Sequence, residues 1–488
     1  MKGNENEKTR WRLCPDCFGQ GKKSRRLKKD AKRRYQIALE HYKKNGSQGP
    51  APIRLKASQI KCATCDGSGL IAAALPPIPD HEIYPHVAII GGGIGGVALA
   101  VACLHRGIPF TLFERDGGFD ARSQGYGLTL QQANKAMNGF GISSLKEGVV
   151  STRHVVHTTD GTIVGEWGMR KWTAADTKKA PKHTNVHIAR QELRLALLEQ
   201  LGGSNMVRWG HDLVALENST ENGIQLTFQV DGDFKTAKAD LVVGADGIRS
   251  AVRRLLIGDV DLPLRYLNCI VILGICALEA LNGFEHDLLD SATVFQTANG
   301  HERIYMMPYT ANSVMWQLSF PMHEQEAKIL SDKGVEALKA EAIKRTQWHD
   351  PIPQIVAATP ESHITGYPVY DREILKPELL ERGGPVTLIG DAAHPMSPFK
   401  GQGANQALLD ALALARNISK GCRPFSGWKS LGIRNSVLIQ FESEMLARSA
   451  SKVKDSAAAA QFLHSDIVLH KADEPRGRCL KNTEDLDF

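Results

Sequence analysis

The sequence predicts an α/β protein in which a parallel, helix-covered sheet is interrupted by a second domain built on a mixed β-sheet. Three observations lead to this prediction. A glycine-rich turn joins an apolar strand to an apolar helix within residues 86–104, and two more strand–glycine turn–helix segments follow. Four stretches rich in β-branched and aromatic residues lie within residues 266–371. A repeated cysteine motif precedes them all and indicates a small N-terminal module.

The length and composition favour a large globular protein. A chain of 488 residues suffices for two or three domains, and 42% hydrophobic residues allow a large core. No apolar run reaches the roughly 18–20 residues of a membrane span, and no apolar stretch of signal-peptide type opens the chain. A cytoplasmic protein without a membrane span is therefore expected. Nine cysteines, an odd number without framework spacing, favour reduced thiols and a metal site over a disulfide scaffold.

The N-terminal module carries two copies of the motif C-x-x-C-x-G-x-G, "CPDCFGQG" and "CATCDGSG". Two such turns supply the four thiolates of a tetrahedral structural zinc site, which folds a module and leaves no open position for catalysis. The expected ligands are Cys14, Cys17, Cys62 and Cys65. The copies resemble the cysteine-rich repeats of DnaJ-type chaperones, in a number sufficient for one zinc. Four unrelated free cysteines are the alternative.

The segment between the two cysteine motifs is strongly basic. Residues 1–80 contain 18 Lys and Arg against seven Asp and Glu, a net charge of +11, whereas the whole chain carries +7. Residues 22–44 contain no Gly or Pro and predict a helix. Its narrow apolar stripe consists of Leu27, Ala31, Tyr35, Ala38, Leu39 and Tyr42. Two interpretations stay open. In the first, this helix presents a face that contacts a polyanion such as RNA or DNA, or a protein partner; in the second, it is a solvated helix packed on the zinc turns.

The first strand–turn–helix segment has the features of a dinucleotide-binding unit. A G-x-G-x-x-G turn follows the apolar strand, an apolar helix begins at Ile94, and a second strand ends at Glu114. Glycines allow the tight turn and the close approach of a pyrophosphate, the helix N-terminus favours the anion, and the acid accepts hydrogen bonds from a ribose. The expected cofactor contacts here are Gly91, Gly93, Gly95, Gly96, Glu114 and Arg115. NAD and FAD both use this motif.

Two later segments favour a flavin. Residues 240–254 form a strand, a glycine turn and a basic helix, and residues 385–415 form a strand that ends in Gly390-Asp391, a loop and a long apolar helix. An acid at a strand end can hold ribityl hydroxyls, and N–H groups at a helix start can stabilise a reduced flavin ring. The candidate residues are Asp246, Asp391, Pro398, Gly401, Gln402, Gly403, Ala404 and Asn405.

These three segments, in this order, resemble the single-component FAD-dependent aromatic hydroxylases of the para-hydroxybenzoate hydroxylase type, which include kynurenine hydroxylases and tetracycline-inactivating flavoenzymes. The resemblance covers residues 84 to about 450. It implies a Rossmann-like FAD-binding fold interrupted by a substrate domain, and it places Arg122 and Arg190 beside the flavin. Lys400 departs from the family, which commonly has a small residue at this position.

The resemblance also implies a reaction. NAD(P)H, which has no binding domain of its own here, reduces FAD; oxygen forms a flavin C4a-hydroperoxide, which hydroxylates a small organic molecule of aromatic or enol type. No residue stands out as a catalytic base. Candidates to touch the substrate are Gln131, Arg170, Trp172 and Trp316, each of which has a structural role as its alternative. Of the two faces of "SVMWQLSF", the apolar one that carries Trp316 lines either a pocket or the core.

The expected organisation follows from these motifs. The boundaries are 1–80 for the zinc module and linker, 81–145, 185–257 and 374–430 for the FAD-binding domain, 146–184 and 258–373 for the substrate domain, and 431–488 for C-terminal helices and tail. Three functions stay open: an FAD-dependent monooxygenase of small molecules, a flavin-dependent enzyme that modifies RNA or a polypeptide recruited by the basic module, and a non-catalytic flavin-binding protein.

Overall fold

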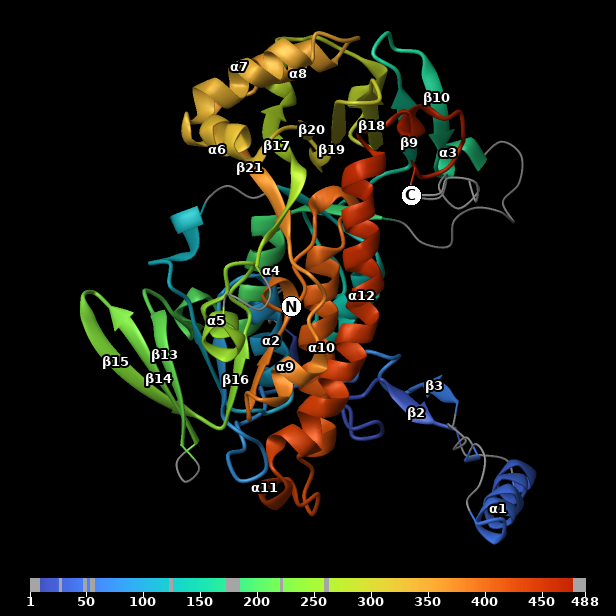
Figure 1. The fold of residues 1–488 in the computed structure, drawn as a ribbon, viewed down its shortest axis with the longest axis vertical. Coiled ribbons are helices and arrows are strands. Elements are labelled where there is room, and N and C mark those ends of the chain that lie inside the picture. Colours follow the sequence, from blue (N-terminus) through green and yellow to red (C-terminus); the bar gives the residue numbers. More distant parts are fainter. Residues whose placement is uncertain are drawn as a thin grey trace, which may run out of the picture.

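The computed structural model describes residues 9–25, 29–46, 51–52, 58–122, 126–172, 185–219, 223–258 and 263–476. The molecule is elongated, with a helix-flanked parallel sheet in its middle part, a larger sheet at one end and the small N-terminal module to one side (Figure 1). Within the described residues, no helix is both long and apolar enough to cross a bilayer.

A five-stranded parallel sheet forms the middle part, as the glycine motifs predict. Its strand order is β12 (Val207–Arg208), β6 (Phe110–Phe113), β5 (Val87–Ile90), β16 (Leu241–Gly244) and β22 (Val386–Leu388). The "VAII" and "LVVG" strands are buried at every position, which is typical of parallel strands covered on both faces.

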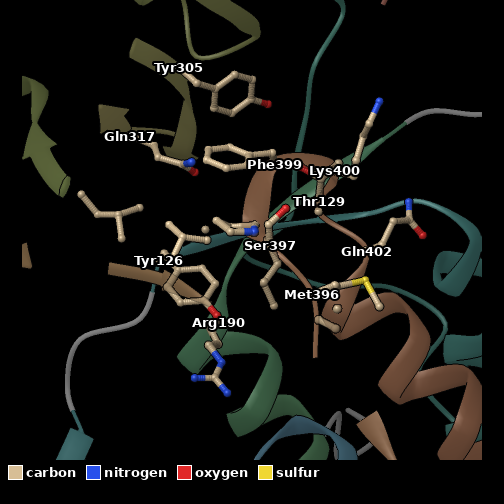
Figure 2. Close-up of a pocket in the computed structure, with 18 of the residues that line it drawn as sticks. Tyr126, Thr129, Arg190, Tyr305, Gln317, Met396, Ser397, Phe399, Lys400 and Gln402 are labelled. Carbon is tan, nitrogen blue, oxygen red and sulfur yellow. The ribbon is translucent and has the colours of Figure 1, made fainter. Parts of the chain in front are cut away.

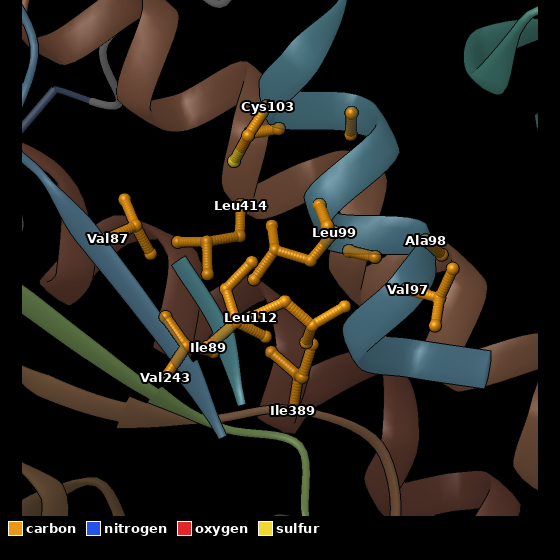
Figure 3. Close-up of a cluster of buried hydrophobic side chains, with 14 of the residues drawn as sticks. Val87, Ile89, Val97, Ala98, Leu99, Cys103, Leu112, Val243, Ile389 and Leu414 are labelled. Carbon is orange, nitrogen blue, oxygen red and sulfur yellow. The ribbon is translucent and has the colours of Figure 1, made fainter. Parts of the chain in front are cut away.

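The helices of this part are α2 (Ile94–Leu104), α4 (Arg190–Leu201), α5 (Ala251–Ile257) and α10 (Gly403–Gly421). Helix α2 packs against α10 and α4. Figure 3 shows the core between sheet and helices, in which Ile89 of β5 and Leu112 of β6 meet Leu99 of α2 and Leu414 of α10. An antiparallel meander of β13 (Asp212–Ser219), β14 (Gly223–Val230) and β15 (Asp233–Ala239) leads from β12 to β16.

A seven-stranded mixed sheet forms the end of the molecule. Its order is β10 (Ile163–Trp167), β9 (Arg153–His157), β18 (Thr293–Ala298), β19 (Arg303–Thr310), β20 (Ser313–Pro321), β17 (Arg265–Ala277) and β21 (Ile364–Asp371). The four predicted strand stretches correspond to β17, β19, β20 and β21. Helices α6 (Glu324–Asp332), α7 (Val335–Arg345) and α8 (Ile352–Ala358) cover its outer face (Figure 1). Gly334, with φ +88°, separates α6 from α7.

Two further parts frame the space between these sheets. A small antiparallel sheet has the order β7 (Gly127–Leu130), β11 (Val186–Ala189) and β8 (Val149–Val150). Helix α12 (Ile439–Phe462) runs along the molecule from α10 to the seven-stranded sheet (Figure 1). The shorter helices are α3 (Met169–Trp172), α9 (Pro377–Glu381) and α11 (Trp428–Leu431).

The N-terminal module consists of two short antiparallel pairs, β1 (Arg10–Leu13) with β4 (Leu70–Ala73) and β2 (Lys22–Ser24) with β3 (Gln59–Lys61), and of α1 (Lys29–Lys44). The predicted helix over residues 22–44 is therefore too long, because its first residues pair with β3. Leu27 of its predicted stripe lies outside the described residues. Helix α1 has no buried residue and extends away from the body (Figure 1), which contradicts the interpretation in which it packs on the cysteine turns.

Candidate functional site

A cavity of about 1100 Å³ lies between the two large sheets. The glycine-rich turn, the start of α10 and the inner face of the seven-stranded sheet line it. Ligands of open α/β sheets bind at the carboxyl ends of the strands, and this cavity occupies that place.

The glycine turn leaves no room for a side chain at Gly91 or at Gly96. A Cβ built on Gly96 would lie 1.9 Å from the carbonyl oxygen of Gly91, and one built on Gly91, which has φ +109°, would lie 2.5 Å from the oxygen of Ala245. Gly93 and Gly95 line the cavity, and a Cβ on Gly93 would meet nothing within 4 Å. Backbone thus forms this wall of the cavity at the start of α2, where a pyrophosphate fits.

Glu114 and Arg194 hold this turn from two sides. The Glu114 carboxylate accepts hydrogen bonds from the N–H groups of Gly92 at 2.6 Å and Asp116 at 3.0 Å. Arg194, which is 7% exposed, donates from Nε to the Gly92 carbonyl at 2.8 Å and stacks on Phe119 at 4.9 Å. Sequence reasoning missed Arg194, although its position one helical turn after Arg190 was a signal. Arg115, expected as a cofactor contact, is exposed.

Asp391 lies on the cavity wall directly after β22. Its carboxylate has no hydrogen-bond partner within the described part of the chain and faces the cavity. The residue is exposed to this open cavity; desolvation by the surrounding protein raises its pKa, while the nearby charges of His394 and Arg190 oppose that shift. Asp391 and the glycine turn line the same cavity, and this carboxylate and this backbone wall fit the ribityl hydroxyls and the pyrophosphate of FAD.

A buried charge network supports the Asp391 loop. Asp410 of α10 is fully buried and accepts hydrogen bonds from the Gly390 N–H at 2.9 Å, from His394 Nε2 at 2.6 Å and from Arg448 of α12. Burial alone would raise the pKa of Asp410, but His394 and Arg448 outweigh it and lower that pKa. Burial likewise would lower the pKa of His394, and Asp410 reverses the direction. Sequence reasoning did not single out Asp410.

Asn405 joins the start of α10 to the loop after β7. Its Nδ2 donates to the carbonyls of Thr129 at 2.8 Å and Gly401 at 2.9 Å, and its Oδ1 accepts from the Gln131 N–H at 2.9 Å. Gln402 Nε2 donates to Gln131 Oε1 at 2.7 Å. The N-terminus of α10 is thereby fixed at the cavity, which Pro398, Gly403 and Ala404 also line.

Of the remaining residues predicted to contact the cofactor, one lines the cavity and one does not. Arg190 lines the cavity near the ring of Tyr126, with 5.7 Å between guanidinium carbon and ring centre (Figure 2). Asp246 is not among the lining residues; it accepts from Ser250 Oγ at 2.5 Å and from the Val252 N–H at 3.1 Å, at the start of α5. The side chain of Arg122 lies outside the described residues.

The seven-stranded sheet turns a polar and aromatic face to the cavity. Tyr305 of β19 pairs with Gln317 of β20, and both side chains extend toward the ring of Phe399 (Figure 2). Burial raises the pKa of Tyr305 to about 12, so its hydroxyl stays protonated. The Gln317 Nε2 group is buried and has no hydrogen-bond partner in the described structure.

Arg303, two residues before Tyr305, is a buried cation on the same face. It is 5% exposed, donates from Nε to Gln296 Oε1 at 2.7 Å and stacks on Tyr305 at 5.0 Å. Burial lowers its pKa to about 10, which leaves it charged at neutral pH. Within the described ranges no carboxylate pairs with it. Lys400 also lines the cavity, 4.9 Å from the ring of Phe462, and burial lowers its pKa.

The predicted substrate contacts are placed differently. Trp316 is fully buried on the opposite face of the sheet and donates to Thr359 Oγ1 at 2.9 Å, so the face that carries it forms core and the alternate face, with Gln317, lines the cavity. Arg170 is not a lining residue; it pairs with Asp290 at 2.5 Å. Gln131 does line the cavity. The side chain of Trp172 lies outside the described residues.

The four motif cysteines form a second, separate cluster. Their sulfur atoms all lie within 4.8 Å of one another, with 3.9 Å between Cys14 and Cys62 and 3.7 Å between Cys17 and Cys65. Zn–S bonds of about 2.3 Å in a tetrahedron require S···S distances of about 3.8 Å. The Gly21 N–H donates to Cys17 Sγ at 3.2 Å. The donor set fits a tetrathiolate zinc.

Comparisons with known proteins agree with this geometry. Residues 84–423 match the model of a family described as FAD binding domain. The Aurachin C monooxygenase/isomerase of Stigmatella aurantiaca is 30% identical over 339 residues, which are 68% of this chain and 80% of that protein. The FAD-dependent monooxygenase thnD of Trichoderma harzianum is 26% identical and covers 76% of this chain and 91% of its own. Klebsiella pneumoniae HpxO, solved with FAD and uric acid, superposes with a TM-score of 0.62 at 21% identity, over 79% of this chain and 89% of that one.

Proposed function

The chain belongs to the superfamily of FAD-dependent aromatic hydroxylases, which are monooxygenases, and on this premise we propose that it hydroxylates an acidic small molecule of aromatic or enol type with NAD(P)H and O₂. The substrate C–H bond becomes C–OH, NAD(P)H is oxidised, and the second oxygen atom leaves as water. The observation that carries the proposal is Arg303, a buried guanidinium beside aromatic rings in the cavity, for which the described residues supply no counter-ion.

The chain itself supplies binding and orientation. FAD, when bound, accepts a hydride from NAD(P)H and activates O₂. Glu114 orders the glycine turn, which would hold the nucleotide end of FAD; the Asp391 carboxylate would accept from ribityl hydroxyls, and the start of α10 would present N–H groups to the ring.

The inner face of the seven-stranded sheet orients the substrate. Arg303 pairs with its anionic group, and Gln317 Nε2, which lacks a protein partner in the described structure, donates a hydrogen bond to it. Tyr305 and Phe399 pack on the ring plane. These groups exclude water from the reacting atoms, and none of them needs to act as a base.

Stopped-flow reduction by NADPH and by NADH tests the proposal, with a panel of aromatic acids and their methyl esters. We expect acids to accelerate flavin reduction or product formation more than their esters. The Arg303→Met variant should lose about 100-fold in kcat/KM for the acid, because a buried charged partner is removed, and little for the ester. Arg303→Lys, which keeps the charge, should recover part of the preference. Equal losses for acid and ester would contradict the role of Arg303, and no reduction of the bound flavin would contradict the enzyme.

We also infer that the cysteine cluster holds one structural zinc. The purified protein is expected to contain one equivalent of zinc by mass spectrometry, and the Cys62→Ser variant to lose it, because a structural site needs its full ligand set. Cys276→Ser, at a buried cysteine remote from the cluster, is the control and should keep its zinc. Wild-type protein without bound zinc would contradict the inference.

Helix α1 favours a second candidate function, in which the flavoenzyme modifies RNA recruited by the basic module. Its sequence has six Lys and Arg against two Asp and Glu, and none of its residues is buried. We expect RNA binding that weakens with salt, and Gln replacements at Lys32, Arg33 and Arg34 should lower the slope by about one per lost phosphate contact. Gln replacements at Lys333 and Lys344 on the outer helices serve as the control. Binding that is absent, or equal in both variants, would rule this candidate out.

A further inference from the structure

Two arginines of the FAD-binding fold contact the cysteine turns, and of these Arg106 is buried and Arg416 is half-buried. Arg106, which follows α2 and is 2% exposed, donates to the Gly19 carbonyl at 3.4 Å. Arg416 of α10 donates to the carbonyls of Ser68 at 3.0 Å and Gly67 at 3.5 Å. In return, Gln20 Nε2 donates to the Arg416 carbonyl at 2.8 Å. Each cysteine turn is therefore held by one guanidinium from the fold below it.

These arginines lack a negative partner of the usual kind. Throughout the described ranges no carboxylate forms an ion pair with either of them, and the Nε atoms of both are buried without a hydrogen-bond partner. An isolated buried charge is strongly unfavourable unless an opposite charge lies nearby. A divalent zinc bound by four thiolates has a net charge of −2, which matches two guanidinium groups. The Cys17 sulfur contributes to the electrostatic environment of both.

The same arginines lie far from the cavity along the two helices that begin there, Arg106 just after α2 and Arg416 in the second half of α10. Helix α2 starts at the glycine turn and ends just before Arg106, whose Nη1 donates to the Ala102 carbonyl in its last turn at 2.9 Å. Helix α10 starts at Gly403 on the cavity wall and carries Arg416 more than three turns later. The two helices pack against each other. Trp11 of the N-terminal module makes a third contact with the fold, at Gly141. A Cβ at that position would lie 2.4 Å from the Trp11 ring, so only glycine fits there.

We propose that the zinc centre is an integral part of the FAD-binding domain, with Arg106 and Arg416 as its counter-charges, and that its occupancy sets the affinity for FAD. The metal centre fixes the distal ends of α2 and α10 relative to each other. Because their first turns form two walls of the cofactor site, loss of the centre lets those walls separate. The inference rests on the proposed zinc site and on FAD binding, and needs no knowledge of the substrate.

The experiment uses the full chain with its flavin removed and measures zinc release to a chromogenic chelator and the Kd of FAD by flavin fluorescence. We expect the paired variant Arg106→Met with Arg416→Met to release zinc about tenfold faster and to bind FAD about tenfold more weakly, within the usual range of coupling between sites. The control pair Arg33→Met with Arg34→Met, on the exposed α1, should leave both values unchanged.

A second measurement does not depend on the folding of a variant. Stripping zinc from the wild-type protein with a chelator should weaken FAD binding about tenfold, and restoring zinc should recover it. An unchanged Kd for FAD after zinc removal, or zinc release at the wild-type rate from the paired arginine variant, would overturn the proposal. Neither readout involves turnover, so failure of the proposed hydroxylation leaves both results interpretable.

Discussion

Replacing Gly96 by alanine is expected to reduce the affinity for FAD by at least about 100-fold, the effect of closing a phosphate-binding turn to its ligand. The added Cβ would lie 1.9 Å from the Gly91 carbonyl oxygen, a distance that no side-chain rotation relieves because both atoms belong to backbone positions of the same turn. Gly91 cannot move away easily, since its N–H donates to the Phe113 carbonyl at 2.8 Å and its own Cβ position is closed by Ala245. The turn must therefore open where the pyrophosphate binds.

Titration of the flavin-free variant with FAD, followed by flavin fluorescence, measures this effect. Gly117→Ala is the matched control, because a Cβ there meets nothing within 4 Å and the residue does not have a positive φ. Wild-type affinity in the Gly96 variant would mean that the cofactor does not bind over this turn.

The Asp410→Ala variant should lose about 3–5 kcal/mol of unfolding free energy, the usual result of removing one member of a buried charge pair. The substitution leaves His394, Arg448 and the Gly390 N–H without their common acceptor. Because these groups connect the Asp391 loop with α10 and α12, FAD binding should weaken as well. Urea denaturation of flavin-free protein measures the stability, and Glu444→Ala, at an exposed position of α12, should change it by less than about 0.5 kcal/mol.

The pH dependence of this difference has a definite sign. The native pKa of Asp410 is lowered, so its contribution is present above the unfolded value of about 3.9 and is lost as the pH falls through the native pKa. The native pKa of His394 is raised, so its contribution is complete below the unfolded value of about 6.5 and is lost as the pH rises through the native pKa. The stability gap between wild type and variant should therefore be widest between about pH 4 and 6.5. A gap that does not change from pH 5.5 to alkaline pH would mean that His394 does not pair with Asp410.

The sequence predicted the structure best where a short motif is compatible with only one local backbone geometry. The strand–glycine turn–helix around Gly91 and Gly96, the acid at Glu114 and the cysteine turns all follow from spacing, because each motif brings its own residues together. Groups that act across the fold were missed. Asp410 looks like one polar residue within an apolar helix, and its role depends on Arg448, which is 38 residues away.

The sequence left the substrate face undecided for a different reason. Alternation along β20 correctly separates two sets of side chains, but both faces of the seven-stranded sheet are covered, one by α6–α8 and the other by the cofactor fold. The alternation of side chains along a strand cannot show which face of the sheet packs into a core and which face lines a cavity. Arg303 was overlooked since a charged residue at a strand start usually faces solvent, and here it lies beneath the flavin-binding part.

The pairing of β2 with β3 brings the two ends of the α1 segment side by side. The residues between Ser24 and Gln59 therefore form an insertion whose ends are already held together. Closing a loop of doubled length costs only about 0.6 kcal/mol more, so this segment can grow, shrink or change its chemistry at little expense to stability. Related enzymes can therefore differ in the partner that the α1 segment binds while they keep the same catalytic domains. The most rapid divergence among close homologues should therefore fall within residues 25–58, between two cysteine turns that stay fixed.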